Sequence, residues 1–355
     1  MVVVNQKILS ANEVLFGSLE LGQGGLLRGD EGRKHALIAG NSWANPVVKV
    51  VESSFHDPWQ SSLIENLIID GNETGSGNRF VTGILLENVM HCMIRNVTIK
   101  NCEVGIHIRS YKGLWSECAC LKHIRMENVK KGVVFTTTGP YKGYPNDPNK
   151  TYPGSEFCSA AFTSIEDVDI GLANYSDAVG IQVGGVQILT DPDPHGVDSY
   201  TTSVKPCDDV DPIDKNANPL LYATGITPYS SHIRARVRLG SLGGTGLKIL
   251  NGMLYWAQAH LTVTKKDGPG GIGIDIQNHP VKRNDRGQPL QQDRAIWYNQ
   301  FSKFAGPKND DTASKKGFVL VVDSNIAIPI TPDLYNAQTN YNGIHADVQI
   351  KTIPT

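Results

Sequence analysis

A twelve-residue pattern recurs along this chain and constrains its fold more than any other feature. The clearest copies, Val97–Ile108 and Ile124–Phe135, read as alternating apolar residues, a short polar turn, then glycine and a second alternation. Alternation with a period of two predicts β-strands that each bury one face. The two copies begin 27 residues apart. A repeat of this length indicates a solenoid in which each coil packs on the next, and it suits one turn of a three-sheet parallel β-helix.

Looser copies extend the repeat over most of the chain. Their first strands begin at Leu67, Val168, Val237 and Leu261. The alternation predicts which side chains face the interior of the coils. The eleven most regular of these positions are Val97, Ile99, Ile106, Ile108, Ile124, Met126, Val133, Val168, Ile170, Ile181 and Val183.

Composition agrees with an all-β solenoid and excludes several classes of protein. The chain has 355 residues, and its 36 glycines and 19 prolines favour many turns and few long helices. Its 33 basic and 35 acidic residues give a net charge of −2, which argues against a nucleic-acid partner. No run of about 18 apolar residues is present, so we expect no membrane span. The first residues do not resemble a signal peptide.

We divide the chain into three regions. Residues 1–60 are expected to form the opening coils, and residues 61–276 the body of the β-helix. Residues 277–355 are expected to hold a loop and the C-terminal strands, which could form a cap or an oligomer contact.

Long polar insertions interrupt the repeat. Residues 136–160, 184–231 and 277–317 are rich in Gly, Pro, Asp and Asn, and each follows the second strand of a copy. Insertions at one corner of successive coils project from the same side. We therefore predict a wall on one side of the solenoid, with a groove beside it and with Tyr144 and Tyr200 as aromatic platforms for a ligand. Oligomer contacts or mobility are the other interpretations of such long loops.

Polar side chains stack when the copies are aligned on their first strand residue. The alignment puts Arg236 beside Asp167 and Arg238 beside Asp169, at the strand spacing of about 4.8 Å. One interpretation is a set of solvated surface pairs, each contributing ~0–1 kcal/mol. The other is a polar floor that binds a sugar or a carboxylate, formed by His123, Arg125, Asp167, Asp169, Arg236 and Arg238.

Asparagines occupy the turn after the first strand. Asn101 and Asn128 share one position in the two clearest copies, while Gly71 and Gly171 take or approximate it elsewhere. Asparagine tolerates left-handed backbone torsions and can bond to turn backbone groups. We expect a structural ladder of asparagines along this corner.

These features give the chain a resemblance to the pectate-lyase-like superfamily of right-handed parallel β-helices. The resemblance is carried by Ile94–Cys102 (IRNVTIKNC), by Gly105–Ile108 (GIHI) and by Leu26–Gly29 (LLRG), and it covers roughly residues 15–280. It implies a right-handed, single-stranded parallel β-helix and a carbohydrate ligand, because most members act on polymeric carbohydrate. Polysaccharide lyases, glycoside hydrolases and phage tailspike proteins are among them. The catalytic signatures of the polygalacturonases and pectate lyases are not present as ordered patterns.

Two kinds of cleavage chemistry are compatible with the residues. A glycoside hydrolase needs two carboxylates about 5–10 Å apart, which Asp167 and Asp169, or Asp208 and Asp209, could supply. A lyase needs a base and a cation that holds the substrate's carboxylate. The base could be His123 or His260, and the cation could be Arg125, Arg236 or Arg238.

The sequence contains no recognisable metal-binding motif. The six cysteines show no zinc spacing, and Cys118 and Cys120 are too close for a metal knuckle. We expect most cysteines to be free and buried. No motif supports calcium, so no cofactor is predicted.

The fold implies an extracellular or virion-associated protein, either an enzyme or a receptor-binding protein. A structural or adhesive subunit is the alternative, and a homotrimer or a polymer is compatible with either.

Overall fold

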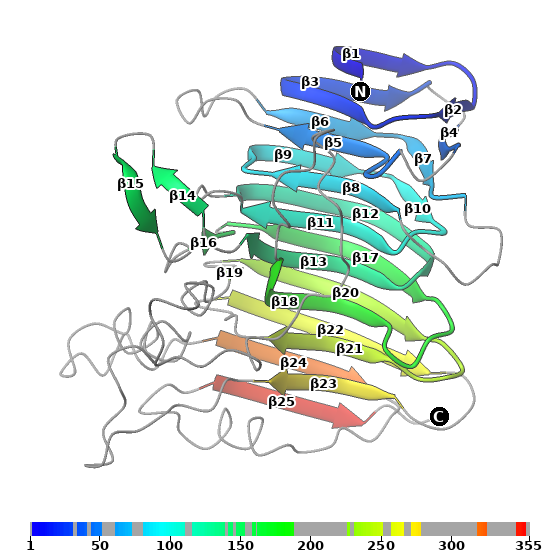
Figure 1. The fold of residues 1–355 in the computed structure, drawn as a ribbon. Coiled ribbons are helices and arrows are strands. Elements are labelled where there is room, and N and C mark those ends of the chain that lie inside the picture. The colour runs from blue at the N-terminus through cyan, green and yellow to red at the C-terminus, as the bar shows by residue number, and fades with distance from the viewer. Residues whose placement is uncertain are drawn as a thin grey trace.

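The protein is all-β and forms a right-handed parallel β-helix, with no helix in the residues that can be described (Figure 1). The prediction of the fold class is confirmed. The computed structural model describes residues 2–30, 34–40, 44–51, 61–72, 81–110, 116–138, 141–144, 147–152, 158–160, 162–187, 226–227, 231–250, 257–265, 271–277, 318–324 and 346–352.

Successive coils wind through three faces, each a ladder of parallel strands. The first face contains the second strand of each repeat. Its strands are β5 (Val48–Val51), β8 (Thr82–Glu87), β11 (Val104–Ser110), β13 (Lys131–Thr138), β18 (Val179–Gln187), β21 (Thr245–Leu250) and β23 (Ile272–Gln277).

The second and third faces follow along each coil. The second face contains β6 (Ser62–Glu65) and β9 (Met90–Arg95), and the third contains β2 (Glu13–Leu15), β4 (His35–Ala39), β7 (Leu67–Asp70) and β10 (Thr98–Lys100). Longer strands bend or run from the second face into the third. They are β12 (Glu117–Val129), β17 (Ser164–Leu172), β20 (His232–Leu239) and β22 (Ala257–Lys265).

The two ends of the chain extend the same stack. At the N-terminal end, β1 (Val2–Leu9) pairs with β3 (Leu19–Gly29), and both strands contribute to the first and second faces. At the other end, β24 (Phe318–Ser324) and β25 (Ala346–Thr352) continue the ladder beyond β22 (Figure 1). Both strands lie within residues 277–355, where C-terminal strands were expected, and they extend the solenoid.

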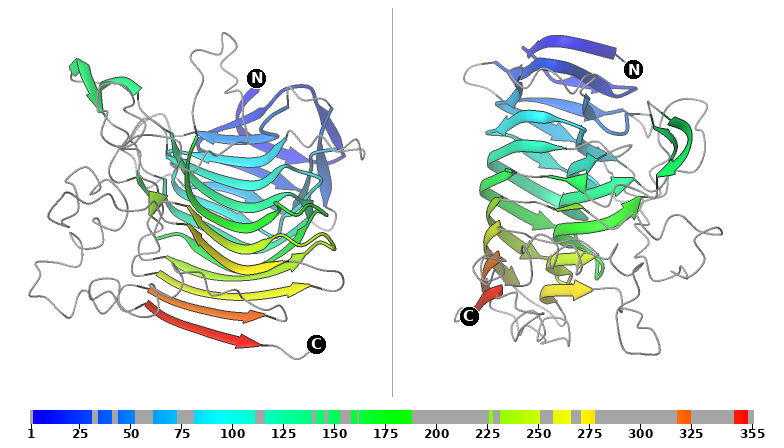
Figure 2. Two further views of the ribbon diagram at one scale, coloured as in Figure 1. Left: turned by 60° about the horizontal axis from the view of Figure 1, so that its bottom comes forward. Right: turned by 90° about the vertical axis from the view of Figure 1, so that its left-hand side faces the viewer.

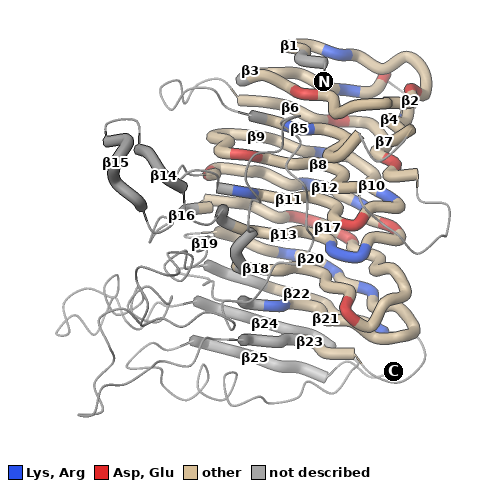
Figure 3. The backbone as a smooth tube through the Cα atoms, in the orientation of Figure 1, with Lys and Arg blue, Asp and Glu red and all other residues tan. Residues whose placement is uncertain are grey.

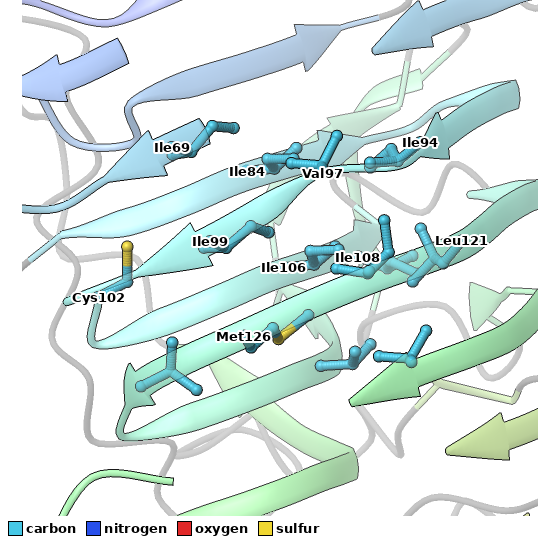
Figure 4. Close-up of a cluster of buried hydrophobic side chains, with 14 of the residues drawn as sticks. Ile69, Ile84, Ile94, Val97, Ile99, Cys102, Ile106, Ile108, Leu121 and Met126 are labelled. Carbon is cyan, nitrogen blue, oxygen red and sulfur yellow. The ribbon is translucent and has the colours of Figure 1, made fainter. Parts of the chain in front are cut away.

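The core is a set of columns in which equivalent apolar residues stack. Ile99 pairs with Ile69 on one side and with Met126 on the other, and the same column continues to Ile170 and Val237. All eleven predicted inward residues are buried, each at most 2% exposed. Figure 4 shows part of this core, in which Ile99, Ile106 and Met126 lie between facing strands.

The alignment of one coil was wrong by two residues. Ala235, not Val237, pairs with Val168, so Arg236 lies opposite Asp169 and Arg238 lies opposite Gly171. The inward and outward faces of β20 were nevertheless predicted correctly, because a shift of two residues preserves the alternation of the strand.

The predicted asparagine ladder is present at the corner between the third and first faces. Asn101 and Asn128 have φ values of 55° and 57°, and Asn128 Nδ2 donates a hydrogen bond to Asn101 Oδ1 at 2.8 Å. Gly71 is in line with Asn101, since its N–H bonds to the adjoining carbonyl of Lys100. Gly171 approximates the ladder position, as predicted: it pairs with Glu127, one residue before Asn128, and the register then shifts.

Only short parts of the insertions are described. The hairpin of β14 (Tyr141–Tyr144) and β15 (Asp147–Tyr152) stands away from the coils (Figure 2). β16 (Cys158–Ser159) pairs in parallel with β19 (Ile226–Thr227), so the first two insertions meet just before β17 and β20 begin. Most of the predicted wall lies outside the described residues.

Four of the cysteines, Cys92, Cys102, Cys118 and Cys120, form no disulfide. Cys92 and Cys102 are buried, and Cys102 belongs to the core cluster (Figure 4). Cys118 and Cys120 are partly exposed, and burial raises the pKa of both thiols. The described residues contain no helix long and apolar enough to cross a membrane.

Core stacking predicts a large cost for shortening an inward side chain. Replacing Ile99 by alanine should lower the free energy of unfolding by about 2–5 kcal/mol, because the cavity lies between two coils that cannot collapse onto it. Urea denaturation measures the change. The neighbouring outward replacement, Thr98→Ala, should change stability by less than about 1 kcal/mol. Equal losses in the two variants would contradict the assignment of the inward face.

Candidate functional site

The outer surface of the middle coils carries a strand of basic residues. Along β20, His232, Arg234, Arg236 and Arg238 are exposed, and the residues between and after them are buried. Strict alternation on a half-buried strand sends these four side chains to the outside. The strand therefore presents a row of positive charge on the surface, part of which is visible in Figure 3.

The two neighbouring strands differ in charge. On one side, β17 contributes Glu166, Asp167 and Asp169. On the other side, β22 contributes His260 and Thr262 and has no carboxylate in its nine residues. The basic strand thus lies between an acidic strand and a strand without negative charge.

A hollow lies across these three strands. It has a volume of about 330 Å³. It is lined by Asp167, Val168, Asp169, Arg234, Ala235, Arg236, His260 and Thr262. Four of the residues predicted to belong to a site therefore come together here, namely Asp167, Asp169, Arg236 and His260. They are contributed by three consecutive coils.

The hollow coincides with a break in the regular stacking. In earlier coils one residue with left-handed torsions makes the corner between the second and third faces. This column consists of Asn66, Asn96, His123 and Asp167, with φ between 52° and 57°. The next coil lacks the corner residue, because β17 places two residues between Ile165 and Val168 whereas β20 places only Arg234 between their partners. Asp167 is therefore the last member of the column.

Both carboxylates of the hollow already have partners. Arg238 Nε donates a hydrogen bond to Asp169 Oδ1 at 2.9 Å. Asp167 Oδ2 lies 3.4 Å from His123 Nδ1, and both side chains are more than half exposed. His123 and Asp167, two members of the predicted polar floor, are therefore neighbours. In contrast, Arg234 and Arg236 make no ion pair or side-chain hydrogen bond within the part of the chain that the structure describes.

On β12 and at the start of β17, beside the hollow, the polar side chains form surface pairs. Arg125 binds Glu127 on its own strand, with 2.6 Å between Nη2 and Oε1. Glu166 accepts a hydrogen bond from the Ser164 hydroxyl and lies 3.6 Å from Lys122, and these contacts lower its pKa. Such exposed pairs contribute little to stability. The interpretation of the ladders as solvated pairs therefore holds for this part of the surface.

The remaining predicted site residues are distributed differently. Arg238 holds Asp169 but does not line the hollow. Tyr144 is placed only as a backbone position in β14, and Asp208, Asp209 and Tyr200 lie outside the described residues. Among the described residues, no group of three His, Cys, Asp or Glu side chains could hold a metal ion.

Arg234 is the residue that the sequence analysis missed. The alignment that shifted β20 by two residues placed Arg236 beside Asp167 and left Arg234 out of the site. The signal was nevertheless present in His232–Leu239 (HIRARVRL), where basic and apolar residues alternate without interruption. Reading this alternation as one straight strand would have included Arg234.

A second polar cluster lies on the first face and is buried. The carboxylate of Glu87 binds Arg109, and its Oε1 lies 3.3 Å from Lys49 Nζ. His107 Nε2 lies 2.6 Å from Thr136 Oγ1. These side chains point out of the coils, yet His107, Arg109 and Thr136 are at most 5% exposed. Burial, then the charges of Arg109 and Lys131, hold the pKa of His107 well below its usual value.

Comparison with known proteins does not assign the chain to a family. No family model, no curated protein and no solved structure matches the chain. The site must therefore be interpreted from its own geometry.

The lowered pKa of His107 predicts a loss of stability in acid. Below about pH 6.5 the unfolded chain binds a proton at this histidine, whereas the folded protein keeps it neutral. The free energy of unfolding should therefore fall as the pH drops from 7.5 to 5. Replacing His107 by glutamine should reduce this slope. Replacing Val134, its apolar neighbour on β13, by alanine should lower stability at every pH and leave the slope unchanged. Denaturant titrations across the pH range measure both, and equal slopes in the His107 variant and the wild type would contradict the assignment.

Proposed function

We propose that this protein binds a saccharide chain that carries acidic groups, with one unit of the chain in the hollow between β17, β20 and β22. The observation that carries the proposal is that the hollow combines two carboxylates with two guanidinium groups, those of Arg234 and Arg236, that have no carboxylate partner among the described residues. Carboxylates accept hydrogen bonds from sugar hydroxyls. Guanidinium groups donate pairs of hydrogen bonds to a carboxylate or sulfate.

The size and position of the hollow suit a segment of a polymer. Its volume of about 330 Å³ is at the lower end of the range for small-molecule sites, about 300–1,000 Å³. It lies on the outside of the stacked coils, so a longer ligand could continue past it along the surface. A polymer could thus contribute one unit to the hollow and others to the polar side chains of neighbouring coils.

Membership in the pectate-lyase-like superfamily is part of the proposal. It is supported by the three parallel faces and by the asparagine ladder at one corner. The ligand would then be a polysaccharide or cell-surface glycan, encountered outside cells or through a virion. The assembly would be a homotrimer or a polymer.

Removal of the two arginines tests the proposal. Arg234→Ala and Arg236→Ala should each weaken binding of an acidic oligosaccharide by roughly 10- to 100-fold, because each removes hydrogen bonds to a charged group. A panel of acidic and neutral oligosaccharides, followed by isothermal titration calorimetry, provides the measurement. Arg95→Ala is the matched control. Arg95 lies two coils before β17, away from the hollow, and is paired with Glu65 on the adjoining strand. If the intact protein binds no glycan, the alternative of a structural or adhesive subunit takes its place.

Cleavage of the bound chain is a second candidate function. It is favoured by the position of Asp167, which lines the hollow and lies 3.4 Å from the His123 imidazole. With Asp169 it offers the two carboxylates of a glycoside hydrolase. His123 or His260 beside an arginine would offer the base and the cation of a polysaccharide lyase.

Replacement of Asp167 by asparagine separates cleavage from binding. Asparagine tolerates the left-handed torsion at this corner, so the fold and the binding of the glycan should remain. Turnover should be lost, as measured by reducing-end and unsaturated-product assays. Glu127→Gln, on the adjoining coil, should leave turnover unchanged. Undiminished turnover in the Asp167 variant would move the search to Asp208 and Asp209.

A further inference from the structure

Asp169 does not form its ion pair with the arginine that the strand register places directly opposite it. Asp169 lies directly opposite Arg125 on one neighbouring strand and Arg236 on the other. Its carboxylate nevertheless binds Arg238, which is two residues further along β20, at 2.9 Å. In a parallel ladder directly opposed residues are about 4.8 Å apart, closer than diagonal neighbours. The carboxylate of Asp169 is thus bound to a more distant position of β20 than the one it faces.

Gly171 explains this diagonal contact. It is the residue opposite Arg238 on β17, and it has no side chain. A Cβ atom added at Gly171 would lie 3.1 Å from Arg238 Nη2 and 3.5 Å from Cζ. The guanidinium group of Arg238 therefore lies close over the backbone of β17, where a side chain at position 171 would press against it. From this position its Nε reaches Asp169.

The other possible partners are also occupied. Arg125, which faces Asp169 from the other neighbouring strand, binds Glu127. Asp167, the second carboxylate of the hollow, lies against His123. Each carboxylate of the hollow is thus held by a group that does not line the hollow, and neither is paired with Arg234 or Arg236.

We infer that Gly171 and Arg238 are positioning residues that hold Asp169 away from Arg236 and so keep Arg234 and Arg236 available for an anionic group of the ligand. The inference deepens the proposed function and rests on it for the identity of the ligand. Two residues apart on a strand, the two arginines are about 6.6 Å from each other along the backbone. Long side chains at this spacing can converge on one carboxylate or sulfate.

The physical consequence is a difference in affinity. If Asp169 were free to bind Arg236, an incoming anion would have to displace it. An exposed ion pair contributes up to about 1 kcal/mol, so this competition would weaken anion binding by about two- to fivefold. The pair formed by Arg238 and Asp169 removes that competition without bringing a further charge into the hollow.

Charge-neutral substitutions at Gly171 test the inference. Gly171→Ala and Gly171→Val place a side chain against the Arg238 guanidinium group, the larger valine displacing it further, and valine suits a strand. The probe is inorganic sulfate at low ionic strength, followed by NMR of the Nε–Hε resonances of Arg234 and Arg236. In the wild type, sulfate should shift both resonances. In the Gly171 variants the apparent affinity at Arg236 should fall about two- to fivefold.

A double variant and a matched control complete the experiment. Adding Asp169→Asn to Gly171→Val should restore the affinity, because the competing carboxylate is gone. Thr264→Val alters the opposite neighbour of Arg238 and should have no effect. Arg238→Ala, with and without Asp169→Asn, repeats the comparison in case a side chain at position 171 strains the strand near the Met126 carbonyl, 3.2 Å from the added Cβ.

The outcomes separate this inference from the proposed function. The inference is overturned if sulfate leaves the Arg234 and Arg236 resonances unchanged in the wild type, if the Gly171 variants bind sulfate as the wild type does, or if Asp169→Asn fails to restore binding. None of these results depends on a glycan. A protein that behaves as predicted with sulfate and binds no oligosaccharide would keep the anion site and lose the saccharide.

Discussion

Direct stacking of equivalent residues from coil to coil is the constraint on which this structure depends. Neighbouring parallel strands lie about 4.8 Å apart, so each side chain meets its own counterpart above and below. Inside the coils, this requirement is met by apolar residues that form columns such as the one through Ile69, Ile99 and Met126. At the corners it is met by left-handed residues that bond to one another, as Asn128 does to Asn101. A change in one coil is therefore felt by both of its neighbours.

The hollow is located where this rule is broken. In the four coils from β6 to β17, one left-handed residue turns the chain between the second and third faces. From β20 onward that residue is absent, and the strand runs straight. Asp167 therefore ends a column, and the arginines of β20 stand beside it without an equivalent corner.

The corner torsion gives a structural reason for the identity of two candidate catalytic residues. Left-handed backbone is uncommon for residues other than glycine, and Asn, Asp and His are enriched there. Asn66, Asn96, His123 and Asp167 are drawn from this set and share one column. Asp167 and His123 are thus compatible with a role in turnover, but the backbone alone accounts for their residue types. Arg234 and Arg236 have no ion-pair partner within the described part of the chain, and the backbone gives no explanation for this, which makes them the stronger indication of a binding site.

The sequence by itself determined the strands, their inward faces and the asparagine corner, because these follow from local periodicity and from the torsions that asparagine accepts. It did not determine the register of β20. A shift by two residues leaves the same side chains inside, so the pattern could not choose between Arg236 and Arg238 as the partner of Asp169. Only the tertiary structure showed that Gly171 leaves room for Arg238 and that His107 is buried although it points outward. It also showed that Arg234 and Arg236 have no carboxylate partner among the residues that the structure describes. Each of these depends on which residues from distant parts of the chain become neighbours, and a repeating pattern does not encode that choice.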